Sequence, residues 1–238
     1  MQRPAMHLSE DVCAARDHAG RWQQPSARLA DGLLRLGLAV DVDRQSQMLQ
    51  YLALLSQWNQ AYNLTAVTEP MAMVERHLLD SLAIAPWVPN GLVVDAGTGA
   101  GLPGLALMMA GCGDRWVLID GNGKKVRFVR HVCRQLGLDR VSAVQQRLEH
   151  WASERRPDAV VARALAPLGQ LVEWTSRWLD QGTVLLAMKA DLQDSELAEV
   201  RPPYNVSVQA LPSQAAGPKR TLAVIGRAGA VETVDNTA

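Results

Sequence analysis

Apolar residues recur at steps of three and four along the first third of the chain, the spacing of an amphipathic helix. The clearest stripe predicts a helix over residues 43–62, and weaker stripes predict helices over 28–40 and 69–85. Residues 1–27 have neither helical nor strand periodicity, and we expect a flexible arm there. The pattern therefore predicts a helical subdomain at residues 28–88 that packs on a larger core.

The period changes near residue 91, where short apolar runs between turn residues replace the helical stripes. Such runs are typical of strands that are buried on both faces of a sheet. They alternate with helical segments, which indicates βαβ units and a parallel sheet with helices on both faces. The predicted strands are 92–96, 115–120, 141–146, 158–162, 182–188, 204–210 and 220–227, and the predicted helices are 102–110, 123–137, 167–179 and 193–200.

The last two predicted strands are joined by residues 212–219, which are too few to hold a crossover helix. This pair should therefore be antiparallel. The prediction for residues 89–227 is a doubly wound, mostly parallel, seven-stranded α/β sheet of Rossmann-like type with a C-terminal antiparallel hairpin. Residues 228–238 are expected to form a frayed tail.

The composition is typical of a soluble globular protein, with 48% hydrophobic and 20% charged residues. Because the formal net charge is zero, a nucleic-acid partner would have to bind a local basic patch. The three cysteines have no paired spacing, which favours free thiols in a reducing compartment, and no metal-ligand pattern predicts a metal. No apolar run approaches the roughly 18 residues that cross a bilayer. We expect a cytoplasmic protein without a membrane partner.

The strongest chemical signal is the segment from Asp95 to Gly104, between a predicted strand and a predicted helix. It reads Asp-Ala-Gly-Thr-Gly-Ala-Gly-Leu-Pro-Gly. Glycine allows positive φ and lets a ligand approach the backbone, and sheets of this kind bind ligands at the carboxyl ends of their strands. Asp120 ends the next strand, where its carboxylate could accept both hydroxyls of a ribose. The loop therefore predicts a nucleotide-like cofactor.

Two cofactors fit this loop. Gly99, Gly101 and Gly104 satisfy the G-x-G-x-x-G spacing of NAD-binding proteins, whereas Gly97, Gly99 and Gly101 give a G-x-G-x-G series that methyltransferases use. Asp95 favours the second interpretation, because a carboxylate can contact the cationic methionine end of S-adenosylmethionine and would repel a pyrophosphate. We expect a methyltransferase that releases S-adenosylhomocysteine, with a nicotinamide-dependent dehydrogenase as the alternative.

Residues that follow the third to fifth strands should complete the site. Arg163-Ala164-Leu165 stands where enzymes that methylate exocyclic amines carry Asp or Asn before Pro-Pro-Tyr, and no cysteine lies at this edge to serve as the nucleophile for cytosine carbon 5. Nitrogen 7 of guanine fits what remains, since its free lone pair needs alignment and no group acting by proton transfer. Arg163 is the candidate for guanine recognition, with Arg147 and Lys189 as further positioning residues.

A basic stretch on the predicted helix 123–137 is the candidate RNA-binding surface. It places five Lys or Arg among residues 124–134 of a chain without net charge. An ordinary solvated helix face is the alternative interpretation. The candidate phosphate contacts are Lys124, Lys125, Arg127 and Arg130.

Several segments together resemble the GidB/RsmG family of 16S ribosomal RNA guanine-N(7) methyltransferases. The resemblance extends over residues 45 to 226 or so. It departs from the family pattern at Leu148-Glu149, where the family has Val-Glu, and at Lys189-Ala190, where the family has Lys-Gly. The matching segments are Trp58-Asn59-x-x-Tyr62-Asn63-Leu64-Thr65-Ala66-Val67, Arg76-His77-x-Leu79-Asp80-Ser81, Gly97 to Gly104, Arg163-Ala164 and Met188-Lys189.

The resemblance implies a class I methyltransferase fold, S-adenosylmethionine as donor and a guanine in the decoding region as acceptor. The partner would be 16S ribosomal RNA or a small-subunit particle, and a monomer is favoured although the oligomeric state stays open. A methyltransferase for a small molecule or a protein is the alternative, because it needs no basic surface. The loop and the resemblance together give the candidate cofactor-binding residues Asp95, Gly97, Thr98, Gly99, Gly101, Leu102, Asp120, Leu148, Glu149 and Arg163.

Overall fold

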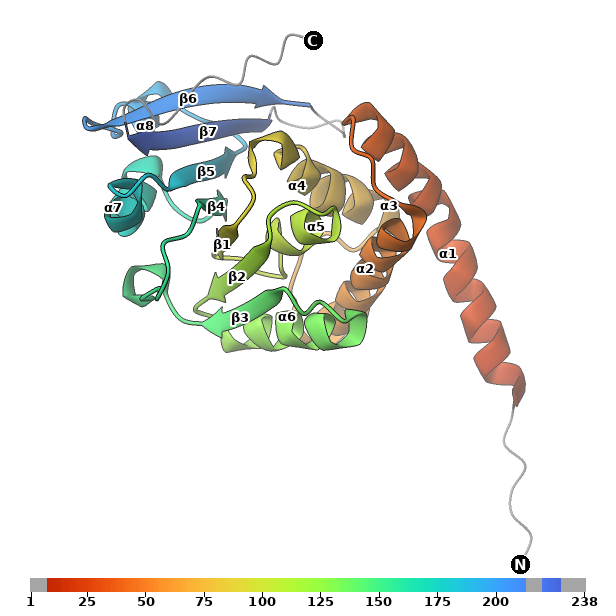
Figure 1. The fold of residues 1–238 in the computed structure, drawn as a ribbon. Helices are drawn as coiled ribbons and strands as arrows, with labels where there is room; N and C mark the ends of the chain where they lie inside the picture. Colours follow the sequence, from red (N-terminus) through yellow and green to blue (C-terminus); the bar gives the residue numbers. More distant parts are fainter. Residues whose placement is uncertain (1–7, 213–219, 228–238) are drawn as a thin grey trace, which may run out of the picture.

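The computed structural model describes residues 8–212 and 220–227. Seven strands form one sheet in the order β3-β2-β1-β4-β5-β7-β6 (Figure 1). Strands β1 to β5 pair in parallel, and β7 is antiparallel to both β5 and β6, which confirms the predicted sheet and its C-terminal hairpin. The strands are β1 (Leu92–Ala96), β2 (Arg115–Asp120), β3 (Val141–Gln145), β4 (Ala159–Arg163), β5 (Val184–Lys189), β6 (Tyr204–Leu211) and β7 (Arg220–Arg227).

Helices flank both faces of the sheet (Figure 1). In the described part of the chain, none of them is long and apolar enough to cross a membrane. The helical elements are α1 (Leu8–Arg35), α2 (Val42–Tyr62), α3 (Pro70–Met73), the π segment η1 (Val74–Leu79), α4 (Asp80–Leu82), the 3-10 turn η2 (Ala85–Trp87), α5 (Gly104–Met109), α6 (Gly123–Leu136), the 3-10 turn η3 (Leu148–His150), α7 (Leu168–Leu179) and α8 (Asp194–Leu197).

Alternating strand residues point into two apolar clusters, one on each face of the sheet. On β1, Val93 joins the cluster beneath α1, α2, α5 and α6, whereas Val94 joins the cluster beneath α7. The first cluster extends from Leu29 of α1 to Leu118 of β2. The N-terminal helices therefore share a core with the sheet, and the segment after α2 reaches the cavity at the carboxyl ends of the strands.

The beginning of the chain differs from the sequence prediction. Helix α1 starts at Leu8, so residues 8–27 are helical where the sequence predicted a flexible arm, and the helix predicted from residue 28 is only the end of a longer one. Trp22 and Leu29 are buried, and their spacing of seven places both on the side of α1 that packs against α3 and η1. So few buried apolar residues do not produce a visible helical pattern in the sequence. Residues 1–7 and the predicted tail at 228–238 lie outside the described residues.

The predicted helix at 69–85 is present, but a π turn interrupts it. Glu69 caps its start, since the carboxylate accepts hydrogen bonds from the N–H groups of Met71 and Ala72 at 3.0 and 2.7 Å. The wider turn of η1 breaks the simple 3.6-residue period, and consecutive residues from His77 to Leu82 are all buried. The polar side chains of this stretch are thereby brought to the ligand-binding edge of the sheet.

Candidate active site

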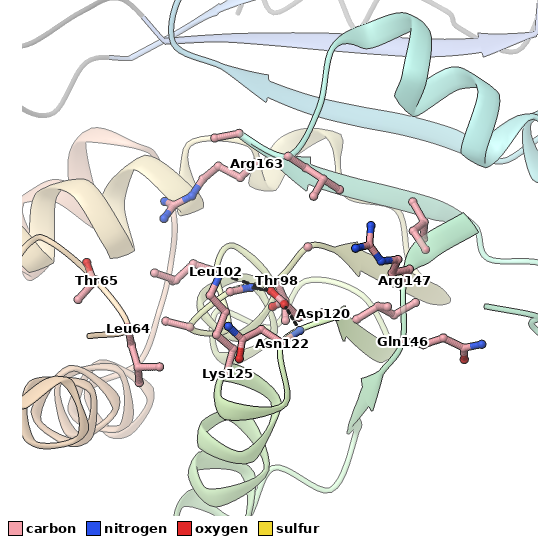
Figure 2. Close-up of a pocket in the computed structure, with 18 of the residues that line it drawn as sticks. Leu64, Thr65, Thr98, Leu102, Asp120, Asn122, Lys125, Gln146, Arg147 and Arg163 are labelled. Carbon is pink, nitrogen blue, oxygen red and sulfur yellow. Dashed lines mark hydrogen bonds and ion pairs between the residues drawn. The ribbon is translucent and has the colours of Figure 1, made fainter. Parts of the chain in front are cut away.

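An open cavity of about 580 Å³ lies at the carboxyl ends of β1 to β4. It lies where the strand order reverses between β1 and β4, which is the usual ligand site of such sheets. Figure 2 shows Leu64 and Thr65, which follow α2, on one side of the cavity and Gln146 and Arg147, which follow β3, on the other. The predicted site residues that line it are Gly97, Thr98, Gly99, Leu102, Asp120, Lys125, Arg147, Leu148, Glu149 and Arg163.

The loop after β1 turns through three glycines with positive φ, +66° at Gly97, +60° at Gly99 and +98° at Gly101. A Cβ on Gly97 would lie 2.5 Å from Cδ1 of Leu165, which also lines the cavity. A Cβ on Gly101 would instead lie 2.3 Å from Cδ1 of Leu105, in α5. Gly97 and Gly99 therefore form the wall of the cavity, whereas Gly101 serves the packing of the loop on its helix.

Asp95 is placed behind the loop and not in the cavity. Its side chain is 0% exposed, and Oδ2 accepts hydrogen bonds from the Thr98 hydroxyl at 2.7 Å and the Gly104 N–H at 2.8 Å. Burial raises the pKa of Asp95 to about 6. Asp95 therefore does not line the cavity, and its placement gives no support to the predicted contact with a cofactor. The acidic residue of the motif instead holds the two ends of the loop together.

Asp120 faces the cavity from the end of β2 (Figure 2). Its Oδ2 accepts a hydrogen bond from the Gly99 N–H at 2.9 Å, and Oδ1 accepts one from the Asn122 N–H at 2.7 Å. The ammonium group of Lys125 lies 3.8 Å from Oδ2. Since a carboxylate has about four acceptor positions, Asp120 can still accept hydrogen bonds from ribose hydroxyls. Lys125, which was predicted to lie on the RNA-binding surface, is thus also a cavity residue.

Arg163 leaves the end of β4 and crosses toward the N-terminal helices (Figure 2). Its Nη1 donates hydrogen bonds to the Arg76 carbonyl at 3.2 Å and to the Ser81 hydroxyl at 3.3 Å. The next residue, Ala164, has φ of +50°, a conformation that residues other than glycine rarely adopt. Strain of this kind is concentrated at functional sites, where the surrounding structure enforces it. The end of β4 is therefore a rigid feature of the cavity wall.

His77 lines the cavity, although it was not among the predicted site residues. Its Nε2 lies 2.9 Å from the Thr65 hydroxyl oxygen, which joins η1 to the segment after α2. Burial, with a contribution from Arg163, lowers the pKa of His77 to about 4. The imidazole is therefore neutral near pH 7. The signal that could have singled it out is its place in the resemblance motif Arg76-His77.

A second cavity of about 300 Å³ adjoins the first and shares His77, Arg163 and Ala164 with it. It contains Lys189, the residue predicted to position substrate from the end of β5. The Lys189 ammonium donates a hydrogen bond to the Ala166 carbonyl at 2.8 Å and forms an ion pair with Glu196 of α8. Lys189 is thus at the predicted edge, but it is held by the protein's own groups.

Apart from Lys125, the predicted basic surface lies on α6 outside the cavity. Lys124, Arg127 and Arg130 are exposed, as is Arg134, and their spacing of three or four places all four on one side of the helix. Arg130 already uses part of its hydrogen-bonding capacity within the protein, since its Nε and Nη2 donate to the Ala143 carbonyl at 3.0 and 2.9 Å. The structure therefore offers a basic stripe that begins beside Lys125 at the cavity.

The cavity also contains residues that sequence reasoning did not single out. Asn122 and Gln146 follow β2 and β3, so the rule about strand ends could have identified them. The rule cannot identify the residues after α2, because they do not follow a strand of the sheet. The cavity residues that were not among the predicted site residues are Leu64, Thr65, His77, Ala100, Ile119, Gly121, Asn122, Gln146, Ala164, Leu165 and Trp174.

Comparison with known proteins identifies close relatives. The model of the GidB family, described as rRNA small subunit methyltransferase G, matches residues 44–222. Ribosomal RNA small subunit methyltransferase G of Chromohalobacter salexigens is 49% identical over 176 residues, which cover 74% of this chain and 84% of that protein. The protein of the same name from Marinobacter nauticus is 38% identical over 208 residues, covering 87% of this chain and 97% of the relative.

Solved structures share the fold at lower identity. A variant of MtNAS aligns with a TM-score of 0.51 at 17% identity over 74% of this chain and 70% of its own. A protein in the NADB-Rossmann superfamily from Streptococcus agalactiae aligns with a TM-score of 0.51 at 13% identity over 62% of this chain and 67% of its own. At these identities the likeness concerns the fold alone.

Proposed function

The chain belongs to the GidB family, rRNA small subunit methyltransferase G, and from this premise we propose that it transfers a methyl group from S-adenosylmethionine to nitrogen 7 of a guanine in 16S ribosomal RNA. The names of the relatives favour ribosomal RNA over the small-molecule or protein substrate that the sequence left open. They also favour a methyl donor over the nicotinamide cofactor that the glycine spacing alone permits.

The residues of the larger cavity fit the methyl donor. Its volume is within the usual range of small-molecule sites, roughly 300–1,000 Å³. Gly97 and Gly99 leave room for a ligand against the backbone, Asp120 offers acceptors for the ribose, and the buried Leu102 and Leu148 supply apolar contacts for the adenine. When bound, S-adenosylmethionine supplies an electrophilic methyl group on a cationic sulfur. The role of the chain is to hold that group at the end of β4.

The observation that carries the assignment to nitrogen 7 is the chemistry of the β4 end. Arg163 can donate hydrogen bonds to a base, but it cannot accept a proton. His77 is enclosed and has a pKa of about 4, so it is a weak base. Neither Cys112 nor Cys133 lines the cavity, and burial raises the pKa of the Cys133 thiol to about 11. Of the side chains that face both cavities, neither Arg163 nor His77 can therefore act as a strong base, which favours an acceptor that needs no deprotonation.

Nitrogen 7 of guanine is such an acceptor, because its lone pair lies in the ring plane and carries no proton. What the protein must provide is alignment, which can account for several kcal/mol of a reaction barrier. Arg163 is held by the Arg76 carbonyl and the Ser81 hydroxyl, so its guanidinium is fixed before the base arrives. Arg147 is exposed on the opposite rim and is suited to a phosphate.

Methylation of small subunits tests the proposal. Subunits from cells that lack this protein are incubated with the purified chain and methyl-labelled donor. We expect label in the small-subunit RNA at a guanine that becomes sensitive to borohydride reduction and aniline cleavage, as 7-methylguanine is. Label at a base that resists this cleavage would overturn the assignment to nitrogen 7. Absence of label in RNA would overturn the substrate class as well.

A variant tests the role of Arg163 in the same assay. We expect Arg163→Ala to fold and to bind S-adenosylmethionine, but to lose at least about 100-fold in methyl transfer, because the base is no longer aligned. Calorimetry with the donor is the control for an intact cavity. Transfer at the native rate would contradict the role assigned to Arg163.

A further inference from the structure

The second cavity lies on the acceptor side of the proposed donor site. Its wall is formed by the π segment η1, by α4, by the ends of β4 and β5 and by the start of β7. His77, Arg163 and Ala164 face both cavities. A molecule in the second cavity would therefore meet one in the first across the end of β4. None of the contacts that fit the methyl donor uses this space.

Asp80 is the one acidic residue among the described residues that line the second cavity. It is 7% exposed, and its Oδ2 accepts a hydrogen bond from Nε of Arg220 at 3.2 Å. Burial raises the pKa of Asp80, and the positive charges of Arg220, Arg163 and Arg76 oppose this rise. The contact with Arg220 holds this buried carboxylate in place. Because it has about four acceptor positions, one pair with Arg220 leaves capacity for a ligand.

The chemistry of a buried carboxylate selects one nucleobase. Guanine presents two adjacent donors, N1–H and the 2-amino group, on its Watson–Crick edge, and a carboxylate can accept both. Adenine and cytosine present a ring acceptor at the corresponding position, and uracil places carbonyl oxygens on both sides of its single N–H. Enzymes that modify a base commonly extrude it into a pocket and read this edge by hydrogen bonds.

We propose that the second cavity holds the target guanine and that Asp80 reads its Watson–Crick edge. This inference rests on the proposed function and names the base-binding part of the same site. Nitrogen 7 lies on the far side of the purine from N1 and the 2-amino group. A guanine held by Asp80 therefore directs nitrogen 7 away from α4, toward the wall that Arg163 shares with the donor cavity.

The remaining groups of the cavity suit a nucleotide. It contains Arg76, Arg163, Lys189 and Arg220, of which Lys189 is paired with Glu196 and Arg220 with Asp80. The excess positive charge favours the phosphates that flank an extruded base. Arg220 has a second role, since its contact with Asp80 joins β7 to α4 and fixes the carboxylate.

Base discrimination tests the inference directly. Small subunits are reconstituted around RNA that carries either guanosine or inosine at the methylated position, because inosine lacks only the 2-amino group. We expect the wild-type chain to prefer guanosine in kcat/KM by about 10- to 100-fold, the range for losing a hydrogen bond to a charged group. Asp80→Asn should lower the rate on guanosine and reduce this preference to a few-fold.

Arg220→Gln is the matched control, since it breaks the same ion pair and leaves the carboxylate. We expect it to lower the rates on both substrates and to keep the preference for guanosine. Donor binding, measured by calorimetry, should be unchanged in both variants. If Asp80 served only the ion pair, the two variants would lose activity alike and neither would change the preference.

Two outcomes separate this inference from the proposed function. Methylation of inosine and guanosine at equal rates by the wild-type chain would overturn the role of Asp80, while nitrogen 7 methylation of small-subunit RNA would stand. If the wild-type chain failed to methylate the guanosine subunits, the proposed function would fall, and the base pocket with it.

Discussion

Gly97 and Gly137 have nearly the same backbone conformation but different surroundings. Substitutions at these two positions therefore distinguish the cost of backbone strain from an effect on the shape of the cavity. Their φ values are +66° and +63°. Gly137 ends α6, and a Cβ there would meet nothing within 4 Å. A Cβ on Gly97 would lie 2.5 Å from Leu165 at the cavity wall.

We expect Gly97→Ala and Gly137→Ala each to lower the free energy of unfolding by about 1 kcal/mol, the cost of the left-handed conformation for an L-residue. Only Gly97→Ala should also raise the Kd for S-adenosylmethionine, by at least about 10-fold, because its methyl group or the displaced Leu165 occupies the site. Denaturant titration and calorimetry measure the two effects. Equal donor binding by both variants would show that the wall at Gly97 does not contact the donor.

Asp95 gives the protein a pH-dependent stability of unusual sign. Burial raises its pKa in the folded chain to about 6 from the ordinary 3.8. Between these values the folded state binds more protons than the unfolded state, so the free energy of unfolding falls as pH rises from about 4 to 6. Above pH 6 the cost of the buried charge is present in full. Asp95→Asn removes this cost and can still accept the hydrogen bonds from Thr98 and Gly104.

We therefore expect the stability of Asp95→Asn relative to the wild type to rise by about 2 to 3 kcal/mol between pH 4 and pH 7. Urea titrations across this range measure the change. Asp139→Asn, at an exposed position, is the control and should follow the wild type. A difference between Asp95→Asn and the wild type that stays constant with pH would contradict the raised pKa.

At the scale of elements, sequence reasoning succeeded where a single period governs the residues. Helix α6 was expected at 123–137 and observed at Gly123–Leu136, since its amphipathic stripe is regular and Gly137 ends it. The glycine loop was placed correctly because a buried strand precedes it. Sequence reasoning failed where tertiary contacts decide the structure. The few buried apolar residues of α1 did not reveal that helix, and the π turn of η1 places His77 against two cavities.

The place of Asp95 behind the loop could not be predicted for a related reason. A motif fixes which residue precedes the glycines, but it does not fix on which side of the turn the side chain lies. The hydrogen bonds with Thr98 and Gly104 settle that question only in three dimensions. The position of Asp120 was easier, because the last residue of a parallel strand next to the loop must face the same crevice.

The basic stripe of α6 is expected to bind RNA through phosphates. Replacing Lys124, Arg127 and Arg134 by Gln removes three exposed charges, and each phosphate contact contributes roughly 0.7 to 0.9 to the slope of log affinity against log salt concentration. We expect the slope for small-subunit binding to fall in magnitude by about 2, with unchanged affinity for S-adenosylmethionine. Filter binding at several salt concentrations measures this.

The matched control is the triple replacement of Arg115, Arg140 and Arg155 by Gln, which removes equal charge at the opposite, amino-terminal ends of the strands. This variant should keep the wild-type slope. An equal decrease in both variants would mean that RNA responds to total charge and that α6 is an ordinary solvated helix face.

At the scale of the whole molecule, the cavity is built by two parts of the chain that share one core. Leu64 and Thr65 come from the N-terminal helical part and Asp120 from the sheet, yet all three line the same space. Beneath them, one apolar cluster joins Leu52 of α2 to Leu118 of β2. A separate helical domain would allow the cavity to open while the sheet stayed folded. A shared core predicts that both parts unfold together.

Native-state hydrogen exchange tests this cooperativity. We expect the slowest amides of α2 and of β4 to open with the same free energy, and both to gain about 2.7 kcal/mol at a donor concentration 100 times its Kd. Leu52→Ala, at a fully buried position, should lower both values together by about 2 to 5 kcal/mol. Leu34→Ala, where the leucine is 80% exposed, is the control and should change them by less than about 0.5 kcal/mol. If α2 opened at a lower free energy than β4 and the donor did not shift it, the helices would be a separate unit that merely rests on the methyltransferase sheet.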